Sequence, residues 1–408
     1  MVLPASQPSQ WEPSSTLAGG CSTSAVQQGT GQLAPREAAD RAEAWLRDCA
    51  WPLWLEHGVD WNARTFHEHL HSDTLACTAG FRRLRVAARQ TYVFSEAALA
   101  GLPRVADAVA LGLDYLDRVA LQPDGGYAFR FDLNGAVIDG TRSLYDHAFV
   151  LLALASASRL GDEEALRTRA HNLINYIKGQ LRHPVEGYLE SLPPAPPRRQ
   201  NPHMHLLEAC LAAAEQFGDD IFLEIADEMI RLFTEKLLLS PGVLGEFFED
   251  DLTPVTEDGK VAAEPGHHCE WTWLVSRWRS LSNDASPAAS AASEALMDFV
   301  DRHAINPRTG TLYNEVWSDG SVRNAESRLW PQTERLKAEV LRQQPSADRA
   351  SAAFLALDRH LAGAPPGLWW ENLREDGSWK VEPAPATSLY HLTCGILESR
   401  KAMRALGW

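Results

Sequence analysis

The chain has 408 residues, of which 45% are hydrophobic, and a formal net charge of −16 that is spread along the sequence. An acidic chain of this kind lacks the basic surface that nucleic acid requires, and no apolar run approaches the ~20 residues of a membrane-spanning helix. The six cysteines are scattered without a CxxC pair, which indicates neither a disulfide framework nor a thiolate zinc site, so we expect a cytoplasmic protein.

The first segment, residues 1–36, is rich in Ser, Pro, Gln and Gly and has neither an apolar period nor the apolar region of a signal peptide. We expect it to be a disordered leader, followed by a single folded domain over residues 37–408. That domain opens with the helical phrase REAADRAEAWLRDCAWPLWLEHG.

Two helical hairpins in the middle of the chain share one pattern. In both LYDHAFVLLALASASRLGDEEALRTRAHNLINYIKGQL and MHLLEACLAAAEQFGDDIFLEIADEMIRLFTEKLL, a histidine opens an Ala- and Leu-rich helix, a Gly-Asp break follows, and a second helix comes after it. Further helix starts recur at similar intervals near Arg89, His267, Trp330 and His391. If the opening helix pairs with the last one, the chain contains twelve helices in six pairs.

The links between these pairs are long and strand-like, whereas the turns within a pair are short. DGGYAFRFDLNGAVIDG, GVLGEFFEDDLTPVTEDGK, GTLYNEVWSDGSVRN and GLWWENLREDGSWKV are such links. Long links must therefore gather at one end of the helices. We predict an all-α fold, an (α/α)6 barrel of six helical hairpins, with long loops and short β-hairpins around a funnel at the active-site end.

Polar residues occur near the start of every helix that we assign to the inner ring. They are Arg89, Tyr145, Asp146, His147, Asn201, His205, Glu208, His267, Glu270, Trp330, Gln332, Glu334 and His391. A single histidine in a helix is more often a structural residue than a functional one. Packing alone hardly explains six helices that each present polar groups at one level, so we expect a site there.

Metal binding is not indicated by the spacing of the histidines. Zinc sites on helices favour an HxxxH pair, which the sequence lacks. His67, His69 and His71, like His203 and His205, are two residues apart, which would put them on one side of an extended strand only. We therefore predict no metal.

Two histidines have a carboxylate three residues later on the same helical face: His267 with Glu270, and His205 with Glu208. A carboxylate that accepts from one ring nitrogen fixes the tautomer and raises the basicity of the other, which suits proton transfer. The alternative is a structural ion pair on the barrel wall.

Six phrases taken in order make the chain similar to a known family. ARQTYVFS, SLYDHAFVLLAL, NPHMHLLEA, PGHHCEWTWL, WPQTE and SLYHL, between about residue 40 and the C-terminus, resemble the N-acylglucosamine 2-epimerase superfamily, which includes cellobiose 2-epimerases, mannose isomerases and sulfoquinovose isomerases. The resemblance implies the same (α/α)6 barrel that the repeat count predicts.

The resemblance also implies roles for individual residues. The catalytic histidines would be His267 and His391. The other residues would bind the substrate: His205 with Asn201 and Glu208 around it, Arg89 and Tyr145 in the pocket wall, Glu270 beside the catalytic phrase, and Trp330 stacked on the sugar.

The chemistry that the resemblance implies is proton transfer next to a carbonyl, without a metal or redox cofactor. The acidic surface disfavours a phosphorylated or sulfonated sugar, so we expect a small neutral monosaccharide unless a local Arg pocket overrides the overall charge. We expect an aldose-ketose isomerase that interconverts D-mannose and D-fructose through an enediol or enediolate, with Arg89 and His205 holding O1 and O2. A sugar 2-epimerase of the N-acylglucosamine or cellobiose type, using the same two histidines, is the close alternative. A glycoside hydrolase with paired carboxylates and a non-catalytic binding protein also stay open. We expect a monomer or a homodimer.

Overall fold

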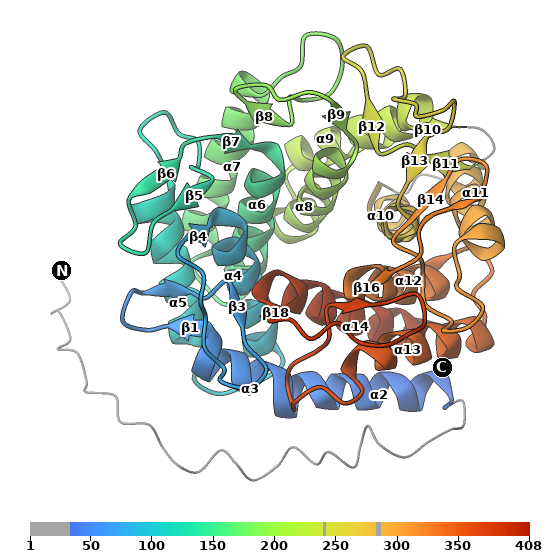
Figure 1. The fold of residues 1–408 in the computed structure, drawn as a ribbon. Helices are drawn as coiled ribbons and strands as arrows, with labels where there is room; N and C mark the ends of the chain where they lie inside the picture. Colours follow the sequence, from blue (N-terminus) through green and yellow to red (C-terminus); the bar gives the residue numbers. More distant parts are fainter. Residues whose placement is uncertain (1–32, 240–241, 283–286) are drawn as a thin grey trace, which may run out of the picture.

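The helices of the chain form two concentric rings in the computed structural model, which describes residues 33–239, 242–282 and 287–408 (Figure 1). The inner ring consists of α4 (Leu84–Leu99), α6 (Leu144–Ser158), α8 (Asn201–Phe217), α10 (Pro265–Ser282), α12 (Leu329–Leu341) and α14 (Ala386–Leu406). Each of these helices packs against the next, and α14 packs against α4, so the ring is closed. The predicted (α/α)6 barrel is confirmed.

An outer helix backs each inner one. The outer helices are α5 (Ala106–Tyr115), α7 (Glu163–Gln180), α9 (Asp220–Leu232), α11 (Pro287–His303), α13 (Ala347–Leu361) and α2 (Pro35–Trp45). Short π-helical turns extend three of them: Leu46–Ala50 and Trp54–Gly58 on either side of α3 (Trp51–Leu53), Leu116–Ala120, and Phe233–Leu237. Because α2 contacts both α13 and α14, the N-terminal helix completes the last pair, as the sequence predicts.

The two rings differ in how their helices are buried. All residues of α6 from Asp146 to Ser158 are buried, because this helix has neighbours on both sides and behind it, and its small Ala and Ser residues let them approach closely. The outer helix α9 buries Phe222, Ile225 and Met229, which recur at helical spacing on one face. Burial of each large side chain of this kind contributes about 1.5–3 kcal/mol to stability.

Short antiparallel strands line the end of the barrel where the long links gather. They are β1 (Val59–Asp60) with β2 (Thr65–Phe66); β10 (Leu238–Leu239) with β11 (Val243–Leu244); β9 (Arg198–Arg199) with β12 (Phe247–Phe248); β13 (Ala262–Ala263) with β14 (Glu315–Trp317) and β15 (Val322–Asn324); β16 (Ser327–Arg328) with β17 (Asn372–Leu373); β18 (Ala384–Pro385) with β3 (His69–Leu70); β4 (Arg82–Arg83) with β5 (Arg130–Phe131) and β6 (Val137–Asp139); and β7 (Arg142–Ser143) with β8 (Ser191–Leu192). The expected hairpins are present, for example β5–β6 and β14–β15.

Each strand that precedes an inner helix pairs with a strand of the next link. The strand before the last inner helix, β18, pairs with β3 in the first link, so these strand pairs also form a closed circle. The hydrogen bonds of these strand pairs extend to the first residue of the following helix. At the start of α4, Leu84 N–H donates to Phe129 O, and at the start of α14, Ala386 N–H donates to Glu68 O. These bonds replace a side-chain cap, and neither α4 nor α14 has one. Without a capping signal, the sequence placed the start of α4 too late, near Arg89.

Three expectations concern the chain outside the barrel core. The expected leader lies outside the described residues except for positions 33–36, of which Pro35 and Arg36 belong to α2. No described helix is long and apolar enough to cross a membrane. The location in the cytoplasm and the single domain over residues 37–408 stay predictions.

The cysteines depart from expectation at one position. Cys77, Cys210, Cys269 and Cys394 carry free thiols, but Cys49 is disulfide-bonded. The spacing of cysteines along a chain does not report which of them meet in space, and for that reason the pattern did not reveal this bond.

Candidate active site

One cavity of about 300 Å³ opens among the N-terminal turns of the inner helices, and every inner helix contributes to its wall. Eight of the nine predicted site residues line it: Arg89, Tyr145, Asn201, His205, His267, Glu270, Trp330 and His391. The ninth, Glu208, lies behind His205. Arg89, Glu270 and His391 are each the sixth residue of their helix, so they meet at one depth, in the second turn and not in the first.

His267 is held by carboxylates that lie outside its own helix. Its Nδ1 lies 2.9 Å from an oxygen of Glu246, in the link before β12, and Gln200 also donates to that oxygen at 3.0 Å. Burial lowers the pKa of His267, but the charges of Glu246 and Glu264 outweigh it and raise the pKa to about 9. His267 is therefore an imidazolium at neutral pH. The predicted pairing of His267 with Glu270 is wrong, because Glu246 occupies that place.

The other ring nitrogen of His267, Nε2, contacts the side-chain amide of Asn201 in the pocket wall. Asn201 Nδ2 lies 2.7 Å from His267 Nε2, while Asn201 Oδ1 is buried without a hydrogen-bond partner among the described residues. Rotation of the amide by half a turn would present that oxygen to a protonated Nε2. Asn201 therefore suits both protonation states of His267.

His391 lies in the opposite electrostatic environment. Burial lowers its pKa to about 4, with further lowering by Arg89 and Lys337, although Glu334 opposes the shift. His391 Nδ1 donates to Glu334 at 3.0 Å, which leaves Nε2 as the nitrogen with a free lone pair. Glu334 is fixed by Lys337 at 2.7 Å and by the indole N–H of Trp273 at 3.0 Å. His391 is therefore neutral at neutral pH and suited to accept a proton.

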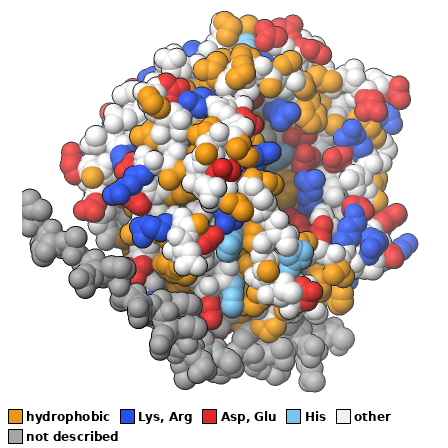
Figure 2. Space-filling model, turned by 60° about the vertical axis from the view of Figure 1, so that its left-hand side comes forward, with side chains coloured by type: hydrophobic (Ala, Val, Ile, Leu, Met, Phe, Trp, Pro, Cys, Tyr) orange, Lys and Arg blue, Asp and Glu red, His pale blue; other side chains and the backbone are white. Residues whose placement is uncertain are grey.

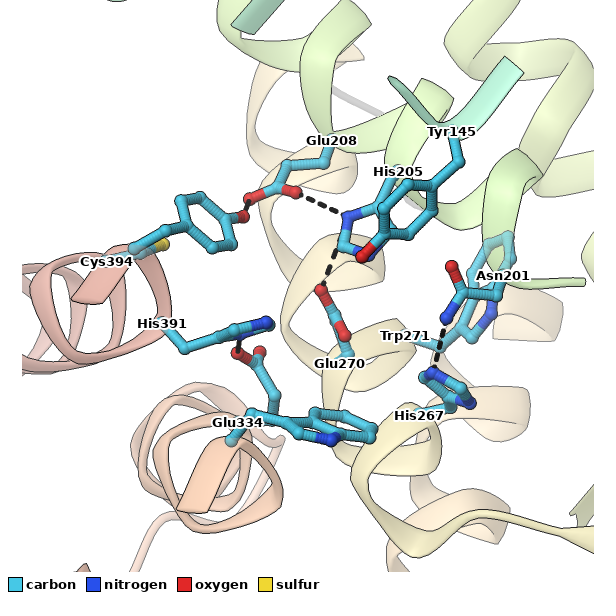
Figure 3. Close-up of polar contacts among 12 residues, drawn as sticks. Tyr145, Asn201, His205, Glu208, His267, Glu270, Trp271, Glu334, His391 and Cys394 are labelled. Atoms are coloured by element: carbon cyan, nitrogen blue, oxygen red, sulfur yellow. Dashed lines mark hydrogen bonds and ion pairs between the residues drawn. The ribbon is translucent and has the colours of Figure 1, made fainter. Parts of the chain in front are cut away.

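His267 and His391, which Figure 3 labels on separate helices, both pack against the indole of Trp330. The centroid of Trp330 lies 4.9 Å from that of His267 and 5.7 Å from that of His391. Gly266 makes this packing possible, because a Cβ at that position would lie 2.5 Å from the Trp330 ring. The glycine before the paired histidines thus has a steric role.

The floor between the histidines contains a buried polar cluster. His205 Nδ1 lies 3.0 Å from Glu208, which also accepts a hydrogen bond from Tyr390. The predicted pair of His205 and Glu208 is thus confirmed. Glu270 lies 3.7 Å from His205, and neither of its buried oxygens has a hydrogen-bond partner among the described residues. Burial and the charge of Glu334 raise the pKa of Glu270 well above its usual value. The raised pKa favours the protonated form of Glu270, and its carboxyl group lines the cavity, where a ligand can bond to it.

Arg89 supplies a permanent cation beside this floor. Its guanidinium donates to the Tyr145 hydroxyl at 2.5 Å and lies 4.0 Å from the centre of the Phe149 ring. Among the described residues it forms no ion pair. A guanidinium without a carboxylate partner suits the stabilisation of negative charge on the oxygens of a ligand.

Comparison with known proteins agrees with this arrangement. Residues 65–395 match the family described as N-acylglucosamine 2-epimerase (GlcNAc 2-epimerase). The chain belongs to this family. It is 34% identical over 385 residues to a mannose-6-phosphate isomerase of Rhizobium meliloti (strain 1021). The aligned region covers 90% of this chain and 98% of the relative. It is 28% identical over 327 residues to a D-mannose isomerase of Thermobifida fusca, and here the aligned region covers 74% of this chain and 77% of the relative.

A solved structure of the same family shares the fold. The cellobiose 2-epimerase from Spirochaeta thermophila DSM 6192 has a TM-score of 0.82 at 21% identity, with 92% of this chain and 98% of that chain covered. The family match and the curated isomerase relatives make the chain a sugar isomerase or epimerase. The family match and the named relatives do not favour the glycoside hydrolase or the non-catalytic alternative; a solved family 76 glycoside hydrolase shares the fold alone, with a TM-score of 0.62 at 10% identity.

Two groups in this epimerase-family site bring enough ligand atoms together to hold an ion: His205 with Glu208 and Glu270, and His267 with Glu246 and Glu264. In both groups the histidine Nδ1 already faces a carboxylate at hydrogen-bond distance. These hydrogen bonds account for both groups without an ion, and a site without metal stays a prediction.

Other histidines of the family phrases have structural partners. His147 Nε2 accepts from the backbone of Tyr127, and His268 Nε2 accepts from the backbone of Leu244. His203 accepts in the same way from Tyr188, while Gln332 Oε1 accepts from Leu312. Each of these side chains also bonds to a backbone carbonyl at the start of its own helix. They anchor the links and are not free for chemistry.

Proposed function

We propose that the protein is an aldose-ketose isomerase that interconverts D-mannose and D-fructose. The observation that carries the proposal is the pair of histidines on one indole, of which His267 is charged and His391 is neutral. Opposite pKa shifts within one pocket assign an acid and a base. Relatives named as isomerases of mannose or its 6-phosphate support this choice of sugar.

In this mechanism His391 is the base and His267 the acid. His267 protonates the ring oxygen as the sugar opens and takes up the proton of the anomeric hydroxyl, so that the aldehyde forms and His267 is an imidazolium again. His391 Nε2 then takes the proton from C2, the C2–H electrons form the C1–C2 double bond, and O1 receives a proton from His267. Return of the first proton to C1 and loss of the O2 proton to His267 give the ketose. Arg89, His205 and the neutral acid Glu270 stabilise the negative charge that develops on O1 and O2.

A 2-epimerase is the second candidate, favoured by the second proton-transferring group that the geometry supplies. An epimerase must return the proton to the opposite face of C2, which requires a second base, and His267 would fill that role. Both reactions use one enediolate. They differ only in the carbon that is reprotonated.

Incubation with mannose in deuterated water, followed by NMR of the products, tests the proposal. We expect fructose labelled at C1, whereas glucose labelled at C2 would replace the isomerase by an epimerase. His391→Asn and His267→Ala should each lower turnover by about 100-fold or more. The matched control is His171→Asn, in the outer helix α7, which should retain activity. Full turnover by both site variants would contradict the assignment.

A further inference from the structure

Four arginines line the pocket in a chain whose net charge is −16. Arg83, Arg85, Arg89 and Arg328 all line the cavity. Figure 2 shows a hollow on this side of the molecule that is bordered by basic as well as acidic side chains. The question is which of these guanidinium groups are available to a ligand.

Arg85 is committed to a structural partner. Its Nε and Nη2 donate to the two oxygens of Asp146, both at 3.0 Å, and Asp146 is completely buried. Its guanidinium lies over the ring of Tyr145 at 4.7 Å. Arg85 therefore supports the pocket wall and contributes little free charge.

Only one of the three guanidinium nitrogens of Arg83 forms a hydrogen bond with a described residue. Its Nε donates to Glu68 at 2.6 Å, and no described residue accepts from its two terminal nitrogens. Because Glu68 is almost entirely buried, it holds the guanidinium in place without covering its outer edge.

Arg328 has no ion pair or side-chain hydrogen bond among the described residues. It is exposed and lies in the pocket wall near Glu264 and Glu371. Burial raises the pKa of each of these two glutamates to about 7, so neither is a full negative charge at neutral pH. Arg328 therefore presents an uncompensated cation to the mouth.

The two available arginines occupy equivalent places in the barrel. Arg83 directly precedes α4 and Arg328 directly precedes α12, and these helices flank α14. Arg83 lies six residues before Arg89, beside the floor, and Arg328 lies six residues before Glu334, the partner of His391; six residues correspond to about 9 Å along the helix axis. That separation suits an open-chain hexose whose C1 and C2 lie at the floor and whose C6 reaches the mouth.

We infer that Arg83 and Arg328 form an anion subsite for a phosphate group on C6, so that the enzyme prefers an aldose 6-phosphate to the free sugar. This inference rests on the proposed function. Guanidinium groups suit phosphate because they offer paired N–H donors. The substrate would then be a sugar phosphate and not the neutral sugar expected from the overall charge, because net charge is an average over the whole surface and does not describe one pocket.

The decisive measurement compares kcat/KM for D-mannose 6-phosphate with that for D-mannose. In the unmodified enzyme we expect the phosphorylated sugar to be favoured by about tenfold or more. Arg328→Gln should lower that ratio by about 10- to 100-fold, and Arg83→Lys, which keeps the charge beside Glu68, should lower it less. Arg302→Gln, an exposed change on the outer helix α11, is the control that should leave the ratio unchanged.

Binding separates failure of the subsite from failure of the proposed reaction. Mannose 6-phosphate binding to His391→Asn, measured by calorimetry, should be weakened by a further Arg328→Gln change even if no isomerisation is detected with either sugar. Turnover of mannose without preference for its phosphate, or a ratio and a binding constant unchanged by Arg328→Gln, would overturn the inference. Absence of turnover with intact phosphate binding would instead overturn the proposed function.

Discussion

Glu246→Gln should move the basic limb of the pH-activity profile to lower pH. The mechanism needs His267 as an imidazolium, so activity falls as the pH rises through its pKa of about 9. Gln retains the shape of Glu246 but removes the negative charge 2.9 Å from the ring. The pKa of His267 must then decrease, and loss of activity must begin at lower pH.

The size of this shift follows from the contacts of His267. An opposite charge within 4–6 Å of a titrating group moves its pKa by roughly 1–3 units. Glu264 stays in place and continues to raise the pKa, so we expect a decrease of about 1–2 units, equivalent to about 1.4–2.7 kcal/mol. The acidic limb belongs to His391, with a pKa of about 4, and Glu246 is not among the groups that shift it. That limb should stay in place.

The assay is kcat/KM for the isomerisation of mannose, or of its 6-phosphate, as a function of pH, since this quantity reports the groups of the free enzyme. Glu249→Gln provides the control, because it removes an identical charge from an exposed side chain three residues away. A basic limb that stays at the same pH in Glu246→Gln, with activity otherwise retained, would refute the role of His267 as the acid.

Three further predictions concern the packing and chemistry of the pocket. Gly266→Ala should push Trp330 from its position and lower kcat/KM by up to about 100-fold, whereas Gly179→Ala, in an outer helix with open space around it, should leave kcat/KM unchanged. Lys337→Met should lower the free energy of unfolding in a urea titration by about 3–5 kcal/mol, because it leaves a buried carboxylate without its cation; the exposed Lys401→Met should change it by less than about 0.5 kcal/mol. Activity should survive prolonged treatment with EDTA, and restoration of lost activity by one divalent ion would reinstate a metal site.

Local periodicity was sufficient to predict the barrel. Helical spacing and Gly-Asp breaks recur at similar intervals, and a short turn forces the two helices of a pair to lie side by side. The level of the site also followed from the sequence, because the polar residues recur near the same point of each repeat. His205 with Glu208 was predictable for the same reason, since i,i+3 neighbours share a helical face.

The partners of the two catalytic candidates were not predictable by this route. Glu246 lies in a link without periodicity, 21 residues before His267, and Glu334 reaches His391 from a neighbouring helix. Nothing in local spacing reports a contact between separate elements. Glu246 is one of six acidic residues in the link over residues 242–260, so the composition of the link indicates neither this glutamate nor the histidine that it contacts.

The contact between α14 and α4 joins the last and the first helix of the inner ring without a covalent bond. Arg89 lies on one side of this junction and His391 on the other, so the catalytic pocket spans the place where synthesis of the barrel begins and ends. An N-terminal fragment that stops before Ala386 has every other helix of the inner ring but no complete pocket. During translation, therefore, the pocket can be complete only after α14 has left the ribosome.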